Sequence, residues 1–102
     1  MPEIVRAALV QSAWTGDKAS MTEANVELAR EAAAQGAQVT CLQELFYGPY
    51  FCQVQDASYF SYAETVPGGP TTELMCSLAR ELGTVMVVPV FEEEQPGVYY
   101  NT

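Results

Sequence analysis

One carboxylate in this sequence is placed where chemistry is possible. Glu44 stands in the segment CLQELFYGPYFCQ, residues 41–53, between an apolar run and a group of aromatic residues. Aromatic side chains that exclude water from a carboxylate disfavour its charged form and raise its pKa. A carboxylate tuned in this way takes up and returns a proton near neutral pH, so one interpretation of Glu44 is a catalytic base. The alternative is a solvated glutamate that ends a strand or caps the following turn.

Few other residues of this sequence suit nucleophilic catalysis or metal binding. The absence of histidine excludes Ser-His and Cys-His couples and leaves a zinc site short of its usual ligands. The cysteines Cys41, Cys52 and Cys76 are odd in number and form no CxxC pair. We therefore expect no metal site, and three reduced thiols that are mostly buried as small hydrophobic residues. Gly68-Gly69 lacks the lysine and the spacing of a phosphate-binding loop.

The composition indicates one small acidic domain. The 102 residues suffice for a modest core, and 49% hydrophobic residues argue against disorder. A net charge of −9 repels nucleic acids and anionic membranes, so we expect neither as a partner. No apolar run approaches the roughly 20 residues that cross a bilayer, and the N-terminus lacks the features of a signal peptide. We expect a cytoplasmic protein.

The first 42 residues predict a strand, a helix and a second strand. The continuous apolarity of residues 4–13 is typical of a strand covered on both faces. Ser20 and Glu23 fit a capping box at the start of a helix, and Gly36 is suited to end it. Residues 37–42 predict a second buried strand. This βαβ order implies parallel strands and a right-handed crossover.

The second half predicts an irregular segment, a helix and two strands. Residues 46–66 carry no regular pattern beyond a possible helical turn at 57–64. Thr71 is the expected N-cap of a helix from Thr72 to Leu82, which Gly83 ends.

The remaining residues predict a strand pair. Residues 84–91 suit a third strand, in which Pro89 marks a bulge or an edge position. The acidic run 92–97 predicts a solvated turn, and residues 98–102 a fourth strand antiparallel to the third.

These elements place Glu44 just beyond the carboxyl end of the second parallel strand, the edge where open α/β sheets bind ligands. So small a sheet leaves a face or an edge uncovered, and residues 98–102 stop within a strand. We therefore expect residues 1–102 to be one part of a larger domain. The alternative is a small free-standing α/β domain.

Four segments resemble, in order, the first portion of the nitrilase superfamily of carbon–nitrogen hydrolases. They read LVQSAWTGD, EAAAQGAQVTCLQELFYGPYFCQ, PGGPTTELMCSLARELGTVMVVPVFEE and YYNT. Within that superfamily, LQELFYGPYFCQ is most similar to the N-carbamoylputrescine amidases and β-ureidopropionases. The resemblance covers essentially the whole chain and implies a four-layer αββα sandwich with a Glu-Lys-Cys catalytic set.

The resemblance assigns one catalytic residue. Glu44 matches the glutamate that acts as general base, and Tyr50 and Gln53 match motif positions that line the substrate pocket. A packed loop aromatic is the alternative role for Tyr50. The lysine and the nucleophilic cysteine of the family lie beyond residue 102. Lys18 does not match the former, and none of the three cysteines matches the latter.

The function implied by this resemblance is hydrolysis of a linear N-carbamoyl amine or N-carbamoyl amino acid, releasing ammonia and carbon dioxide. No cofactor is expected. The expected partners are that substrate, the remaining segment of the same enzyme and a second copy in a homo-oligomer. The 102 residues alone are expected to be inactive. The alternative is a non-catalytic α/β module that serves in assembly through its open edge.

Overall fold

The computed structural model describes residues 3–102 and contains a parallel three-stranded sheet. Its strands are β1 (Ala7–Leu9), β2 (Val39–Cys41) and β3 (Val85–Val87), with β2 in the centre. Helix α1 (Lys18–Ala34) connects β1 to β2, and α2 (Pro70–Leu82) precedes β3. The predicted βαβ unit is therefore confirmed.

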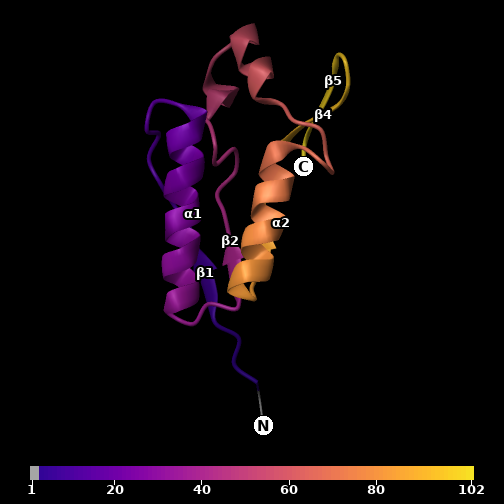
Figure 1. Ribbon diagram of the computed structural model, residues 1–102. Coiled ribbons are helices and arrows are strands. Elements are labelled where there is room, and N and C mark those ends of the chain that lie inside the picture. Colours follow the sequence, from indigo (N-terminus) through magenta and orange to yellow (C-terminus); the bar gives the residue numbers. More distant parts are fainter. Residues whose placement is uncertain (1–2) are drawn as a thin grey trace.

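Both helices lie side by side on one face of this sheet (Figure 1). An ion pair between Arg30 on α1 and Glu81 on α2 joins them. Alternation along the strands turns Ala8, Thr40 and Met86 toward the helices. The opposite face is open in the described residues: Leu9 is 87% exposed and Val85 63%. The prediction that the first strand is covered on both faces is thus wrong for residues 3–102.

The last two strands form a separate antiparallel hairpin. Strand β4 (Phe91–Gln95) pairs with β5 (Val98–Asn101) around the turn at 96–97. Figure 1 shows this hairpin near the N-terminal end of α2. The irregular segment 46–66 contains two short 3-10 helices, η1 (Phe51–Gln53) and η2 (Ala57–Tyr62).

Three predictions about this region are wrong. The expected strand 84–91 is divided into β3 and β4, because Pro89 lacks the N–H group that a continuous ladder requires. Strand β5 consequently pairs with β4 and not with β3. Residues 92–95, expected in a solvated turn, lie within β4, and the turn is shorter than predicted.

The helix starts also differ from prediction, whereas the helix ends do not. Asp17 caps α1 by accepting a hydrogen bond from the Ser20 backbone N–H at 2.7 Å, so the predicted capping box is not formed. Helix α2 begins at Pro70 with Gly69 as its N-cap, and Thr71 lies inside its first turn, because Pro70 suits the first helical position. The predicted ends at Gly36 and Gly83 are confirmed, both in the left-handed region with φ of 94° and 65°.

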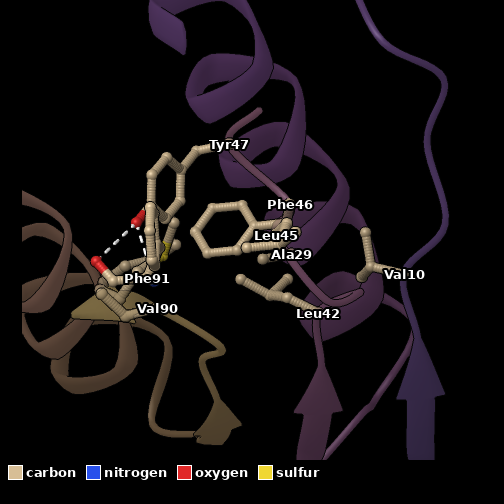
Figure 2. Close-up of a cluster of buried hydrophobic side chains, with 10 residues drawn as sticks. Val10, Ala29, Leu42, Leu45, Phe46, Tyr47, Val90 and Phe91 are labelled. Carbon is tan, nitrogen blue, oxygen red and sulfur yellow. Dashed lines mark hydrogen bonds between the residues drawn. The ribbon is translucent and has the colours of Figure 1, made fainter. Parts of the chain in front are cut away.

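A single hydrophobic cluster holds the helices, the end of β2 and the start of β4 together (Figure 2). Phe46 and Tyr47 are its largest fully buried members, and their rings meet edge to face at 5.2 Å between centroids. Leu42, Leu45 and Phe91 surround them. The residues directly after β2 thus supply the centre of the core.

Neither α1 nor α2 is long and apolar enough to cross a bilayer, and the same holds for every helix in residues 3–102.

Candidate active site

Glu44 lies at the carboxyl edge of the parallel sheet, as predicted. Strand β2 ends at Cys41, and two residues later the side chain of Gln43 binds the backbone of the segment that follows β1. The Gln43 carboxamide accepts from the Ser12 backbone N–H at 2.9 Å and donates to the Ser12 carbonyl oxygen at 3.1 Å. The segments that follow β1 and β2 are therefore joined immediately before Glu44.

The backbone turns sharply after Glu44. Leu45 has φ of 53°, the only non-glycine residue in 3–102 with positive φ, and such a conformation costs of order 1–3 kcal/mol. The Gly48 backbone N–H closes the turn on the Leu45 carbonyl oxygen at 3.0 Å. Burial of Leu45, Phe46 and Tyr47 offsets this strain. The turn therefore sends three side chains into the core and leaves Glu44 on the surface.

The carboxylate of Glu44 is exposed and accepts a hydrogen bond from Asn101. The Asn101 Nδ2 lies 2.5 Å from the Glu44 Oε1. The expectation that aromatic rings shield this carboxylate from water is thus wrong in the described residues. Phe46 and Tyr47 follow Glu44 in the sequence, but the turn at Leu45 directs them into the core.

Of the two predicted pocket residues, Tyr50 is the one whose pKa is affected by the charge of Glu44. The pKa of Tyr50 lies above its usual value because of its proximity to Cys52 first and to the Glu44 carboxylate second, since negative charge on either disfavours the phenolate. The Tyr50 side chain is 51% exposed, which contradicts its alternative role as a packed loop aromatic. Gln53 is exposed on η1.

A cavity of about 490 Å³ lies on the η1–η2 segment, and Gln53 is not among the residues that line it. Its lining residues are Phe51, Cys52, Val54, Gln55, Asp56, Ala57, Tyr59 and Phe60.

Glu64 is a second carboxylate of interest, and the sequence analysis assigned no role to it. Glu64 is 6% exposed. Its Oε2 forms an ion pair with Lys18 Nζ at 2.6 Å and accepts from the Thr71 hydroxyl at 2.5 Å. Its Oε1 accepts from the Thr71 backbone N–H at 2.8 Å. Glu64 therefore supplies the side-chain cap of α2 that Gly69 cannot provide.

The partners of Glu64 determine its protonation state. Burial raises the pKa of Glu64, but the hydrogen bonds from Lys18 and Thr71 and the charge of Lys18 outweigh burial and hold it below its usual value. The carboxylate is thus kept charged. The sequence signal that could have found it is an acidic residue shortly before a helix whose N-cap is glycine.

Tyr47 links the buried carboxylate to the hairpin. The Lys18 ammonium lies 4.6 Å from the centroid of the Tyr47 ring. The Tyr47 hydroxyl accepts from the Phe91 backbone N–H at 2.9 Å and donates to the Phe91 carbonyl oxygen at 3.4 Å, as Figure 2 shows. Burial, together with the charge of Glu64, raises the pKa of Tyr47 to about 12, although the Phe91 hydrogen bond lowers it.

The cysteines are distributed differently from the prediction. All three are free thiols, as expected. Cys41 is partly buried, whereas Cys52 and Cys76 are exposed, so the expectation that most are buried is wrong. Cys52 lies in the exposed η1, and Cys76 stands on α2 beside the buried Met75. Residues 3–102 contain no group of three or more acidic or cysteine side chains that could hold a metal ion.

Comparison with known proteins decides the family. Residues 6–102 match the model of a family described as carbon-nitrogen hydrolase. The chain belongs to the carbon–nitrogen hydrolase family. The resemblance to carbon–nitrogen hydrolases, which is strongest over residues 41–53, is therefore confirmed.

Relatives of this carbon–nitrogen hydrolase chain include plant amidases. It is 40% identical over 99 residues to an N-carbamoylputrescine amidase of Solanum lycopersicum, covering 97% of this chain and 33% of the relative. It is 41% identical over 100 residues to an N-carbamoylputrescine amidase of Arabidopsis thaliana, covering 98% and 33%. An omega-amidase of Homo sapiens is 35% identical over 98 residues, covering 95% and 33%.

A solved structure supports the same assignment. The crystal structure of a carbon–nitrogen hydrolase from Helicobacter pylori matches with a TM-score of 0.86 and 25% identity, covering 95% of this chain and 33% of that one. The chain thus has the fold of one part of that enzyme, and it spans about a third of the length of the relatives it matches.

Proposed function

We propose that this chain carries the general base of a carbon–nitrogen hydrolase that cleaves a linear N-carbamoyl amine or N-carbamoyl amino acid, and that Glu44 is that base. One observation carries the proposal: in a chain about 40% identical to N-carbamoylputrescine amidases, Glu44 stands at the ligand-binding edge of the sheet with its carboxylate exposed. A base must be reachable by the proton it removes.

The reaction assigns Glu44 two proton transfers. It removes the proton of a cysteine thiol, whose sulfur attacks the carbamoyl carbon and forms a C–S bond. It then delivers that proton to the amine nitrogen as the C–N bond breaks. Water hydrolyses the resulting S-carbamoyl cysteine, which restores the thiol, and the carbamic acid so formed decomposes to ammonia and carbon dioxide. The cysteine, and the lysine that stabilises the carbonyl oxygen, belong in this proposal to the remaining segment of the enzyme.

Lys18 is unsuited to the role of that lysine. Its ammonium is already paired with the buried carboxylate of Glu64. Tyr50 and Gln53 are proposed to line the substrate pocket. For Tyr50, the effect of the Glu44 charge on its pKa supports this role.

A non-catalytic assembly role is the second candidate, and the open face of the sheet favours it. Leu9, Val85 and Val87 expose apolar surface on that face, as a sheet covered by another layer would require. The two candidates are compatible if the covering layer is the remainder of the enzyme or a further subunit.

The decisive experiment restores the missing groups. Residues 1–102 are joined to the remaining two thirds of the Solanum lycopersicum amidase, and ammonia release from N-carbamoylputrescine is measured. We expect hydrolysis, and a decrease of kcat by about 10²–10⁴-fold in Glu44→Gln, the usual contribution of a general base. Glu23→Gln, on the exposed face of α1, is the matched control. Unchanged activity of Glu44→Gln would show that another group is the base.

A further inference from the structure

Two side-chain contacts anchor the turn at 44–47 to the β4–β5 hairpin. Both reach the same cross-strand pair, Phe91 and Asn101, which we call the rung. The Tyr47 hydroxyl bonds to the backbone N–H and carbonyl of Phe91. The Asn101 amide donates to the Glu44 carboxylate. Phe91 and Asn101 are directly opposite each other in the β4–β5 register. One cross-strand pair therefore fixes both ends of the turn that presents Glu44.

This rung is held firmly by the rest of the fold. Val90 and Thr102, the neighbouring pair, exchange backbone hydrogen bonds of 2.6 and 2.9 Å. On its other edge, Phe91 accepts from the Glu64 backbone N–H at 2.8 Å, and its ring is 8% exposed. Asn101 thus projects from a strand that is hydrogen-bonded and packed, and it offers a fixed donor to Glu44.

The chemistry of the contact suits positioning. An exposed glutamate without a fixed partner samples several rotamers, and ordering it costs side-chain entropy. The amide of Asn101 is neutral, so it orients the carboxylate without the full charge that an ammonium would add. It contacts Oε1, and the strained turn at Leu45 fixes the backbone beneath.

We propose that Asn101 is the positioning residue of Glu44: its amide holds Oε1 so that Oε2 is aligned to exchange the proton with the nucleophile. This inference rests on the proposed function, because it concerns how Glu44 acts as a base.

The test uses the joined enzyme described above and a double-mutant cycle. Asn101→Ala is expected to lower kcat by about 10–100-fold, the loss that misplacement of a reacting group by about 1 Å produces, with KM within about twofold. In the Glu44→Gln background the same substitution is expected to cause no further loss, because the two residues act as a unit. Asn101→Asp, which sets a carboxylate against Glu44, is expected to be at least as impaired as Asn101→Ala.

The control is Tyr100→Phe on the same strand. It removes a side-chain hydrogen bond of the hairpin, from the Tyr100 hydroxyl to Glu94 at 3.2 Å, without touching Glu44. Its kcat is expected to equal that of the unsubstituted enzyme. An equal effect of Asn101→Ala in both backgrounds, or an effect on KM alone, would overturn the inference and give Asn101 a merely structural or substrate-binding role.

The outcomes separate the inference from the proposed function. If Glu44→Gln abolishes hydrolysis and Asn101→Ala retains full kcat, only the inference fails. If the joined enzyme is inactive, or Glu44→Gln is fully active, the proposed function fails and the inference with it.

A second measurement covers variants that do not fold. In the 102-residue chain, the side-chain amide signal of Asn101 in a ¹⁵N–¹H spectrum is expected to move in Glu44→Gln and to stay in place in Glu23→Gln. An Asn101 signal that is unaffected by Glu44→Gln would show that the contact is absent and overturn the inference.

Discussion

Glu44 and Glu64 are the same side chain in opposite situations. Glu44 is exposed and its Oε1 is held by one neutral amide. Glu64 is buried, and both of its oxygens are occupied by Lys18 and Thr71. A carboxylate that is fully paired and kept charged stabilises the fold, but it cannot readily take up a proton. The carboxylate left reachable is the one that we propose as the base, and the comparison teaches that burial with a full set of partners fits a carboxylate for a structural role.

The largest expected effect is a loss of activity on substitution of Glu44. In the joined enzyme, Glu44→Gln should lower kcat by about 10²–10⁴-fold, while its free energy of unfolding stays within about 0.5 kcal/mol, the range of surface substitutions. Steady-state kinetics and urea denaturation measure the two quantities. A large loss of stability in this variant would remove the contrast with Glu64.

The next largest effect is a loss of stability on substitution of Glu64. Glu64→Ala leaves the Lys18 ammonium and the Thr71 N–H without their acceptor, and it should cost about 3 kcal/mol in free energy of unfolding. Urea denaturation of the 102-residue chain, with Glu23→Ala as the control, checks this value. A cost as small as that of the control would mean that the buried ion pair contributes nothing.

The tightness of packing around Glu64 gives a third test. A Cβ at Gly69 would lie 2.4 Å from the Thr65 carbonyl oxygen and 3.2 Å from the Glu64 Cβ. Gly69→Ala should therefore destabilise the chain by about 1–3 kcal/mol, because backbone must move to admit it. Thermal unfolding measures the effect, and Ser77→Ala on the exposed side of α2 is its control.

Tyr47, which connects the two regions, provides a fourth test. Tyr47→Phe leaves the buried Phe91 N–H without its acceptor and should cost about 1–2 kcal/mol. The pKa of Tyr47 rises from 10.0 to about 12 on folding, so the unsubstituted chain should also lose stability between about pH 10 and 12, where the unfolded state ionises first. Denaturation at increasing pH should show a smaller alkaline loss in Tyr47→Phe.

The smallest effect is the acid response of Glu64. Its pKa in the folded chain lies below the ordinary value of 4.5, so its contribution to stability is present above about pH 4.5 and disappears as the pH falls through the folded pKa. The difference in unfolding free energy between the unsubstituted chain and Glu64→Gln should shrink over that interval. A difference independent of pH would contradict the charged state assigned to Glu64.

Local patterns predicted the features that neighbouring residues determine. The βαβ unit, the helix ends at Gly36 and Gly83 and the position of Glu44 after β2 all follow from periodicity and from glycine conformations. Asp17 was missed as the cap of α1 because Ser20 offers an equally good local signal, and only the fold selects between them.

The features that failed depend on distant residues. Asn101 lies 57 positions from Glu44, and the Lys18–Glu64 pair joins the first residue of α1 to the segment that follows η2. The exposure of Glu44 depends on a left-handed turn at Leu45 that no residue type signals. The pairing of β5 with β4 follows from the break at Pro89. The sequence indicated an interruption at Pro89, but it did not show that a separate strand begins after it.

The pairing of Phe91 with Asn101 also makes the site sensitive to the length of a distant loop. Successive residues of a strand face opposite sides, so a shift of β5 by one position would place Tyr100 or Thr102 on this rung and turn the Asn101 amide away. A one-residue insertion or deletion at Pro96–Gly97 would therefore break the hydrogen bond from Asn101 to Glu44, although the residues of the turn at 44–47 stayed the same.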